Sequence, residues 1–248
     1  MTKFALLLQA LDIPRFGRQK CAFTCDSHQA DLLHRASKRT ILNCSRQVGK
    51  STIAALKAVH TAHHKPNVTV IVTSPTKQQS RELIRKIRTF AYIAGSSLRG
   101  GRDSVDFKNG SRVLAIAADE DTVRGFSAVS LLIIDEAARV SDEVYFALLP
   151  SLAVSGGAVW LLSTPKGKRG FFYAEWHTAE IEGWTTMKLS AHDCARIKPD
   201  FLAKQKRRLG ERRFMQDYEC YFLDSTQGMF HADTVRNAFK ETISSLDI

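Results

Sequence analysis

The feature that most constrains this chain is the stretch of residues 44–52, CSRQVGKST, which follows a short apolar run and precedes a helical pattern over residues 52–63. A strand, a tight loop ending in Gly-Lys-Ser and a helix form the phosphate-binding loop of many nucleotide-binding proteins. In such a loop, backbone N–H groups and the helix N-terminus point at one spot and attract an anion. Gly49 lets the backbone come close because it has no Cβ. Lys50 would reach the β- and γ-phosphates, and the Ser51 hydroxyl would bind Mg²⁺.

The loop departs from the usual pattern at its first position. Glycine normally opens it, and this chain has Cys44 there. Taken alone, the stretch also fits an ordinary strand-to-helix turn in which a serine caps the helix. The nucleotide-binding interpretation involves eight consecutive residues: Ser45, Arg46, Gln47, Val48, Gly49, Lys50, Ser51 and Thr52.

Charge and cysteine usage narrow the class of protein. Lysine and arginine total 36 against 25 acidic residues, a net charge of +11, which favours a polyanionic partner, nucleic acid before membrane. The alternative is an ordinary protein with a basic surface. The five cysteines are scattered and no secretion signal is present, which predicts a reducing cytosol. No apolar run reaches about eighteen residues, so we expect no membrane-spanning segment.

Strand and helix patterns alternate along most of the chain. The expected strands are residues 40–44, 68–73, 129–134, 159–162 and 184–189, and the expected helices are residues 51–63, 141–152, 171–181 and 200–217, with one more after residue 76 whose apolar face carries Leu83, Ile84, Ile87 and Ala91. Residues 104–107 and 111–117 flank Asn109-Gly110, which is a strong hairpin signal. The alternation predicts an α/β fold with a mostly parallel sheet and helices on both faces.

The same patterns divide the chain into three parts. Residues 1–38 are mostly helical and amphipathic, and we expect an N-terminal arm there. Residues 39–222 hold the alternating pattern and form the expected core. Residues 223–248 lose the pattern, which indicates a linker or tail rather than a second domain. A chain of 248 residues is ample for a sizeable core.

Polar side chains end two of the expected buried strands. Asp135 and Glu136 close an apolar run, at the place where open α/β sheets bind ligands. In P-loop enzymes the first acid holds Mg²⁺, and the second can orient the attacking water or take its proton. The alternative is a helix cap followed by a solvated first-turn acid. Ser163 and Thr164 end the next strand, where hydroxyls can sense the γ-phosphate; an ordinary strand-ending turn is the alternative.

Two arginines are candidates for stabilising the charge that phosphoryl transfer places on the phosphate oxygens. Arg46 lies inside the phosphate loop, and Arg124 lies in an irregular stretch before the acidic strand. An arginine that reaches this charge, from the same subunit or a neighbour, is worth roughly 10³–10⁵ in rate. Either side chain would serve instead to bind DNA or a surface carboxylate.

Three stretches resemble the ATPase domain of tailed-phage terminase large subunits. They are residues 45–52, SRQVGKST, residues 132–137, LIIDEA, and residues 162–167, LSTPKG, in the same order and spacing. The Arg-Gln-x-Gly-Lys-Ser form, without the leading glycine, is more similar to terminases than to most P-loop families. The resemblance runs from about residue 27 to residue 228 and implies a P-loop NTPase fold of the ASCE/RecA-like type.

The resemblance also implies roles for single residues. Gln29 is similar to the glutamine that recognises adenine, and Arg46 is similar to the arginine of the terminase phosphate loop. Asp135 and Glu136 resemble the Mg²⁺-side acid and the catalytic glutamate. Ser163 and Thr164 are similar to the hydroxyl residues that couple hydrolysis to DNA movement. Arg124 is similar to the arginine that terminases offer to a neighbouring subunit.

For the whole protein, the resemblance implies an ATP- and Mg²⁺-dependent motor that moves double-stranded DNA into a procapsid in the host cytoplasm. The implied partners are double-stranded DNA, a portal protein, a small terminase subunit and further copies in a ring, commonly a pentamer. Candidate DNA contacts are the basic residues Lys166, Lys168, Arg169, Arg207 and Arg208. Because residues 223–248 hold few acids, we expect no metal-dependent nuclease activity from this chain.

Two other functions fit part of the pattern. A superfamily-2-like helicase or DNA translocase shares the Asp-Glu pair and an upstream glutamine, but it needs a second motor domain. A basic DNA-binding module with a nucleotide site that does not turn over is the other alternative. The presence of both Lys50 and Glu136 argues against that module.

Overall fold

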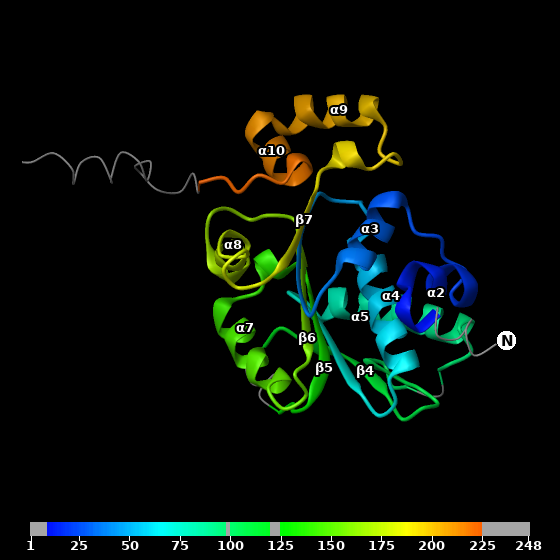
Figure 1. The fold of residues 1–248 in the computed structure, drawn as a ribbon. Coiled ribbons are helices and arrows are strands. Elements are labelled where there is room, and N and C mark those ends of the chain that lie inside the picture. Colours follow the sequence, from blue (N-terminus) through cyan, green and yellow to red (C-terminus); the bar gives the residue numbers. More distant parts are fainter. Residues whose placement is uncertain (1–8, 98–99, 120–124, 225–248) are drawn as a thin grey trace, which may run out of the picture.

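The structure is a computed structural model that describes residues 9–97, 100–119 and 125–224. Within them, strands form one seven-stranded sheet in the order β3-β4-β2-β5-β6-β1-β7 (Figure 1). The strands are β1 Arg39–Cys44, β2 Thr69–Ser74, β3 Ser104–Asp106, β4 Arg112–Ala117, β5 Val129–Asp135, β6 Ala158–Ser163 and β7 Thr185–Leu189. All neighbouring pairs are parallel except β3 with β4. The predicted mostly parallel sheet is therefore confirmed.

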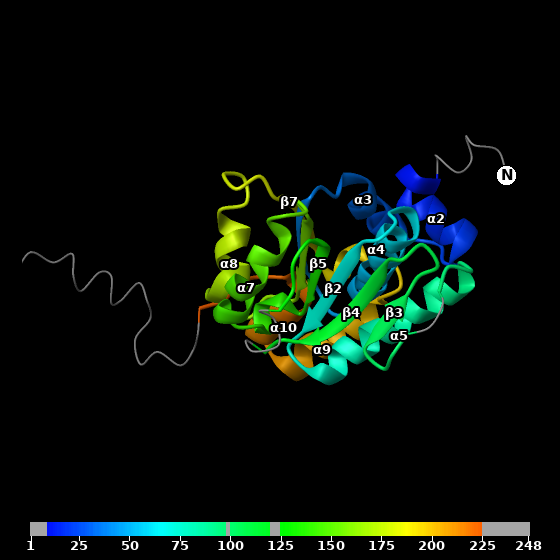
Figure 2. The same cartoon turned by 90° about the horizontal axis from the view of Figure 1, so that it is seen from below.

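Helices cover both faces of the sheet (Figures 1 and 2). The described helices are α2 Ile13–Lys20, α3 Ser27–Arg35, α4 Lys50–His64, α5 Lys77–Ile93, α7 Asp142–Leu148, α8 Gly170–His177, α9 Pro199–Leu209 and α10 Glu211–Glu219, with short 3₁₀ turns η1 Ala137–Arg139, η2 Leu149–Leu152 and η3 Ala191–Asp193. Helices α2 to α5 lie on one face, and α7 and α8 lie on the other. Helices α9 and α10 follow β7 and lie beyond one end of the sheet.

Side chains of the central strands alternate between the two layers, as the strand period of two requires. On β5, Leu131 and Ile133 pack in the core formed with α4 and α5, whereas Leu132 and Ile134 pack in the core formed with α7 and α8. A strand buried on both faces reads as a continuous apolar run, which is why no polar residue interrupts positions 131–134. The strand then ends at a carboxylate.

The hairpin between β3 and β4 is confirmed and is tied to the neighbouring helix. Gly110 has φ +81°, a conformation that glycine adopts without strain. The Asn109 Nδ2 group donates to the Ala62 carbonyl at 2.8 Å, at the end of α4. The four residues predicted to form one face of α5 are all buried: Leu83, Ile84, Ile87 and Ala91.

Three predicted helices are shorter than the patterns indicated. Helix α7 gives way to the η2 turn because Pro150 has no N–H to continue the α-helical ladder. The predicted helix over residues 200–217 is two helices, since Gly210, with φ +77°, ends α9 before α10 starts. Helix α8 ends at His177, before the predicted end at residue 181.

The sheet topology brings three chain segments to one end of the sheet. Strand β6 lies between β1 and β5, so the loop after β1, Asp135 at the end of β5 and Ser163 at the end of β6 share one edge. Helices α9 and α10 lie above this edge (Figure 1). None of the described helices has the length and apolar content needed to cross a bilayer.

Candidate active site

The loop between β1 and α4 has the backbone of an anion-binding loop. Gly49 is the N-cap of α4 at φ +88°, and Gln47 has φ +65°. A Cβ added at Gly49 would lie 2.5 Å from the Gln29 Nε2 atom, so any other residue would be strained and would displace the Gln29 amide. In the described part of the chain, the N–H groups of residues 47–51 donate to no other group. They are therefore available to a phosphate.

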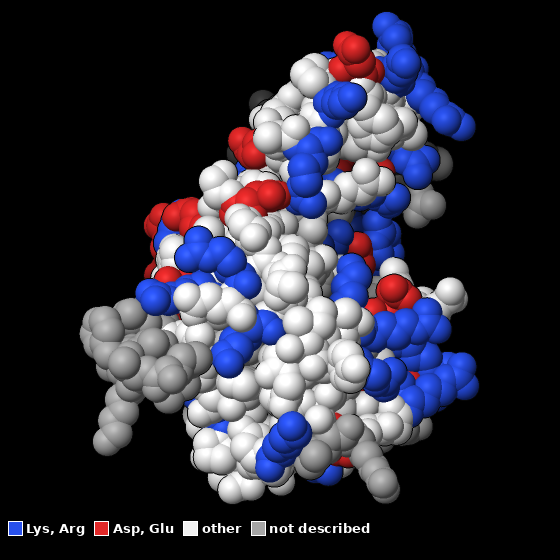
Figure 3. Space-filling model, turned by 90° about the vertical axis from the view of Figure 1, so that its right-hand side faces the viewer, with Lys and Arg blue, Asp and Glu red and all other residues white. Residues whose placement is uncertain are grey.

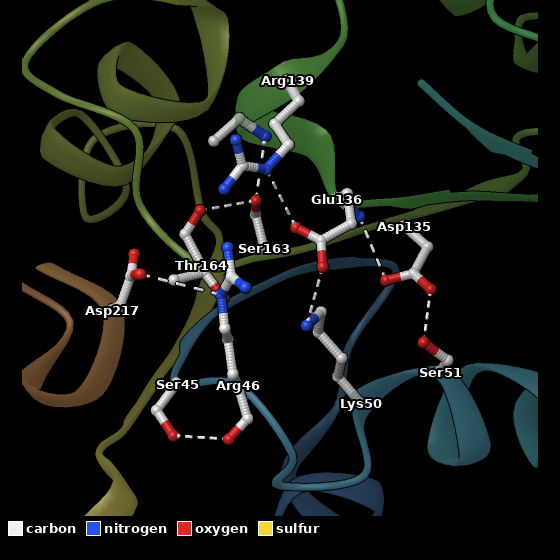
Figure 4. A network of polar contacts seen from close by, with 11 residues as sticks. Ser45, Arg46, Lys50, Ser51, Asp135, Glu136, Arg139, Ser163, Thr164 and Asp217 are labelled. Atoms are coloured by element: carbon white, nitrogen blue, oxygen red, sulfur yellow. Dashed lines mark hydrogen bonds and ion pairs between the residues drawn. The ribbon is translucent and has the colours of Figure 1, made fainter. Parts of the chain in front are cut away.

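Lys50 is buried at the start of α4 and faces Glu136. Its Nζ atom lies 2.9 Å from Glu136 Oε1, with only 10% of the lysine side chain exposed (Figure 4). Burial works against the ammonium charge, but the carboxylates of Glu136 and Asp135 and the hydrogen bond to Glu136 outweigh it and raise the pKa of Lys50. Lys50 therefore stays cationic at neutral pH, as a phosphate ligand must.

Ser51 and Asp135 place two oxygen atoms side by side. The Ser51 hydroxyl donates to Asp135 Oδ2 at 2.5 Å, and the Glu136 N–H donates to Asp135 Oδ1 at 3.0 Å. Burial raises the pKa of Asp135, although Lys50 and the Ser51 hydrogen bond oppose that rise. Both oxygens line a cavity of about 120 Å³. A hydroxyl and a carboxylate beside an open cavity fit Mg²⁺, which takes oxygen ligands and retains waters.

Glu136 adopts a conformation that its sequence position does not reveal. Its backbone has φ 56° and ψ 40°, the left-handed region, which costs a non-glycine residue roughly 1–2 kcal/mol. Two cations hold the carboxylate from different directions, because Arg139 Nε lies 3.6 Å from Oε2 while Lys50 lies at Oε1 (Figure 4). Backbone strain of this kind is concentrated at functional sites.

Arg46 points from the phosphate loop to α10. Its Nε atom lies 3.8 Å from Asp217 Oδ2, and its side chain is half-exposed. The backbone is fastened as well, since the Arg46 N–H donates to the Asp217 carbonyl at 3.3 Å. Ser45 is fully buried, and its hydroxyl donates to the Arg46 carbonyl at 3.0 Å. The loop and α10 are therefore in direct contact (Figure 4).

Ser163 and Thr164 lie beside the turn that carries Glu136. The Ser163 hydroxyl accepts a hydrogen bond from the Ala138 N–H at 3.1 Å and donates to the Thr164 carbonyl at 2.8 Å. Thr164 Oγ1 is buried and has no hydrogen-bond partner in the described part of the chain. Of the two predicted hydroxyls, Ser163 therefore joins β6 to the η1 turn after Glu136.

Gln29 lies against the outside of the phosphate loop. The side chain is 2% exposed; its Nε2 donates to the Val48 carbonyl at 3.2 Å, and its Oε1 accepts from the Asp26 N–H at 3.0 Å. Arg196 also donates to the Val48 carbonyl, at 3.2 Å, and its Nε lies 2.8 Å from Asp26 Oδ2. The structure therefore brings Gln29 into contact with the loop, and its role in adenine recognition stays a prediction.

The remaining residues predicted from the sequence lie in different parts of the structure. Thr52 lies in the first turn of α4, where its N–H donates to the Gly49 carbonyl at 3.0 Å. Lys168 pairs with Asp224 at 3.0 Å, whereas Arg207 and Arg208 are exposed on α9. Lys166 and Arg169 line a groove with Arg46, described below. Arg124 lies outside the described residues.

Three further site residues were missed from the sequence: Arg139, Arg196 and Asp217. Arg139 could have been predicted to pair with Glu136, because it follows that residue by three positions. Arg196 and Asp217 had none, since each meets the loop across more than 140 intervening residues.

The fold and this site define the class of the protein. A phosphate loop after β1, facing an Asp-Glu pair at the end of β5 with one strand between them, is the arrangement of a P-loop NTPase of the ASCE type. The sequence model of the family "Terminase large subunit, T4likevirus-type, N-terminal" matches residues 41–236. The chain belongs to this terminase large-subunit family.

Individual relatives agree with that assignment. The terminase large subunit of Escherichia phage T5 is 30% identical over 196 residues, which cover 72% of this chain and 42% of the T5 protein. The chain thus spans less than half the length of that relative. The large terminase ATPase domain of Thermus phage P74-26 shares the fold with a TM-score of 0.73 at 20% identity, over 84% of this chain and 98% of that one. The large terminase of another thermophilic bacteriophage, in complex with ADP, has a TM-score of 0.66 at 13% identity, over 90% of this chain and 54% of that one.

Proposed function

We propose that this chain binds and hydrolyses ATP, and that the protein containing it uses the energy to move double-stranded DNA into a procapsid. The observation that carries the hydrolysis is the pair of contacts at the mouth of the phosphate loop, Lys50 with Glu136 and Ser51 with Asp135. Together these contacts supply a phosphate ligand, oxygen ligands for Mg²⁺ and a carboxylate for water. Membership of the terminase large-subunit family supports the DNA-moving role.

The residues divide the work of binding and hydrolysis. The loop N–H groups and Lys50 hold the phosphates, and Gly49 leaves them room. Ser51 and Asp135 would hold Mg²⁺, which neutralises phosphate charge when it is bound. Glu136 orients the attacking water and takes its proton. Because Lys50 touches Glu136 in this structure, an arriving γ-phosphate competes for Lys50 and releases the carboxylate.

Gln29 has hydrogen-bonding capacity left for adenine. A primary amide offers two N–H donors and two acceptor lone pairs, and the structure uses one of each, toward Val48 and Asp26. The remaining donor and acceptor match the donor–acceptor pattern of an adenine edge. We infer that the base binds beside Gln29, with Val48 and Ser45 shaping the buried wall of the loop.

Coupling to DNA involves the elements above the loop. Arg46 contacts α10, and the Ser163 hydroxyl contacts the turn after Glu136, so loss of the γ-phosphate would alter both contacts. A net charge of +11 supports DNA as the partner. Figure 3 shows lysines and arginines spread over the face that carries α2 to α5, with acidic residues among them. In the proposed function, the basic residues that contact DNA are Lys166, Lys168, Arg169, Arg207 and Arg208.

The proposed assembly is the one that the family implies. A portal protein, a small terminase subunit and a ring of copies, of the pentameric type, would be partners in the host cytoplasm. Arg124 would act on the nucleotide of a neighbouring subunit. A rate of ATP hydrolysis that rises faster than protein concentration, and that Arg124→Ala makes linear, tests the last point.

The decisive experiment compares Glu136→Gln with Glu180→Gln, the same substitution at an exposed position beyond the end of α8. We expect Glu136→Gln to lower ATP turnover by about 10²–10⁴ while ATP binding remains, because only proton transfer and water orientation are lost. Glu180→Gln should turn over ATP like the parent. Turnover in Glu136→Gln above half of the parent rate would remove Glu136 from the reaction.

A further inference from the structure

A basic groove lies next to Glu136, on the side that carries Arg139, and takes no part in the hydrolysis steps proposed above. Its volume is about 590 Å³, and it lies between the phosphate loop, the turn after β6 and α10. Its cationic lining residues are Arg46, Arg139, Lys166, Arg169, Arg212 and Arg213. Among the described residues, only Asp217 and Asp224 add negative charge to the lining, which leaves a surplus of four positive charges.

The positive charge is only partly neutralised by contacts within the chain. Asp217 Oδ2 lies 3.8 Å from Arg46 Nε and 3.7 Å from Arg213 Nε, so one carboxylate serves two cations. Asp224 is occupied by Lys168, at 3.0 Å. Lys166 and Arg169 have no ion-pair partner within the described part of the chain. Uncompensated cations gathered around a groove attract an anion.

The inner end of the groove borders the reaction. Arg139, which lines the groove, also lies 3.6 Å from Glu136 Oε2. Arg46, in the phosphate loop itself, lines the groove as well. An anion formed at the end of the triphosphate would therefore meet these two arginines, and Lys166 and Arg169 line the same groove.

The other cavity beside Glu136 offers a much worse path for an anion. It measures about 120 Å³, and its charged lining is Asp135, Glu136 and Glu82 with Lys86 as the only described cation. The side chains that line that cavity carry a net negative charge and include the proposed Mg²⁺ ligands, whereas those of the basic groove carry a net positive charge. The two sides of Glu136 thus differ in both charge and size.

We propose that the basic groove binds the inorganic phosphate cleaved from ATP and is its route out of the site. This rests on the proposed hydrolysis. In that step the water oxygen bonds to the γ-phosphorus, the bond to the β–γ bridging oxygen breaks, and the electron pair leaves with ADP. The water proton passes to Glu136, and HPO₄²⁻ remains beside Arg139. Guanidinium groups suit this ligand because they hold phosphate oxygens with two parallel hydrogen bonds.

The test uses Lys166→Ala/Arg169→Ala, which removes two groove cations that have no ion-pair partner among the described residues, against Lys65→Ala/Lys108→Ala, which removes two exposed cations at the opposite end of the sheet. Inorganic phosphate is titrated in the presence of saturating Mg²⁺-ADP, and binding is followed by ³¹P NMR line broadening. Phosphate binding should be about twofold to thirtyfold weaker in the groove variant, the range for two solvent-exposed charge contacts. The control variant should match the parent.

The same proteins are then compared in steady-state ATP turnover with added phosphate. We expect the groove variant to need several times more phosphate for half inhibition. Equal phosphate binding in parent and groove variant, or no binding to the parent at millimolar phosphate, overturns the proposal. Arg169→Glu lowers the groove charge by the same two units, so it should weaken phosphate binding to a similar extent while retaining the parent's circular dichroism spectrum, and it repeats the test with a single change.

DNA backbone phosphates share this chemistry, so a short duplex is titrated in parallel. Weaker duplex binding in the groove variant with unchanged phosphate binding would assign the groove to DNA and overturn the exit route. The binding experiment needs no turnover. A parent that binds phosphate through Lys166 and Arg169 but hydrolyses no ATP would therefore refute the proposed hydrolysis and leave the anion site intact.

Discussion

Gly49→Ala is the substitution whose cost the structure specifies best. Two separate penalties arise. Alanine at φ +88° is held in the left-handed region, which costs about 1–2 kcal/mol. The new Cβ would also lie 2.5 Å from Gln29 Nε2, so the amide moves away and loses its hydrogen bond to the Val48 carbonyl, worth about 0.5–1.5 kcal/mol. The free energy of unfolding should fall by about 1.5–3.5 kcal/mol in total.

Gly95→Ala is the matched control. Gly95 has φ +66°, and a Cβ added there would meet nothing within 4 Å, so this variant carries the backbone strain alone. Urea unfolding of both variants should therefore differ by about 0.5–1.5 kcal/mol, the share of the Gln29 contact. In a Gln29→Ala background that difference should vanish, because the displaced side chain is gone. Equal unfolding free energies for the two glycine variants in the parent background would refute the reasoning.

Gly49→Ala should also weaken nucleotide binding, which is a second, independent measurement on the same variant. The new methyl group displaces the Gln29 amide and strains the loop backbone at residue 49, so binding of a fluorescent ATP analogue should weaken at least tenfold, equivalent to about 1.4 kcal/mol. Gly95→Ala should bind the analogue like the parent, since Gly95 follows α5 and lies outside the site.

Two further predictions concern stability. Burial, reinforced by His64, lowers the pKa of His60 from 6.5 to about 3, so the unfolded chain takes up the proton first. The stabilisation by neutral His60 is complete above pH 6.5 and falls by about 1.4 kcal/mol per pH unit as the pH falls toward 3. The free energies of unfolding in urea at pH 7.5 and pH 5 should therefore differ by about 2 kcal/mol because of this group. His60→Gln should flatten the dependence of the unfolding free energy on pH. Tyr145→Phe removes the hydrogen bond that the buried Tyr145 hydroxyl donates to Glu175 at 2.7 Å. The free energy of unfolding should fall by about 1.5–3 kcal/mol, with no change in ATP turnover. A fall of less than about 0.5 kcal/mol would contradict this prediction.

The parts of the fold that the sequence predicted are those set by local chemistry. The Asn109-Gly110 hairpin, the doubly buried strand at residues 131–134 and the Gly49-Lys50-Ser51 loop each depend on neighbours a few residues away. The break between α9 and α10 was missed although Gly210 marks it, because the basic residues on both sides suggested one helical face. A glycine with a positive φ after a helical run is a stop signal in its own right.

The parts of the site that the sequence did not predict depend on contacts between distant segments. Arg196 reaches the Val48 carbonyl only because β7 pairs with β1 and carries the chain back over the phosphate loop. Asp217 meets Arg46 for the same topological reason, through α10. Neither residue lies in a motif, and an arginine or aspartate on a basic amphipathic helix looks like a solvated surface residue until the fold is known.

The Lys50–Glu136 contact explains why a strained glutamate is tolerated before nucleotide arrives. Roughly 1–2 kcal/mol of backbone strain at Glu136 is offset by two cations, one of them buried, at a site where ion pairs gain from reduced solvent. A triphosphate brings more negative charge to Lys50 than one carboxylate does, so ATP draws Lys50 away. ADP, without a γ-phosphate, competes less well for the same ammonium. Under the proposed function, Glu136 is therefore released for water only when the phosphate to be cleaved is in place.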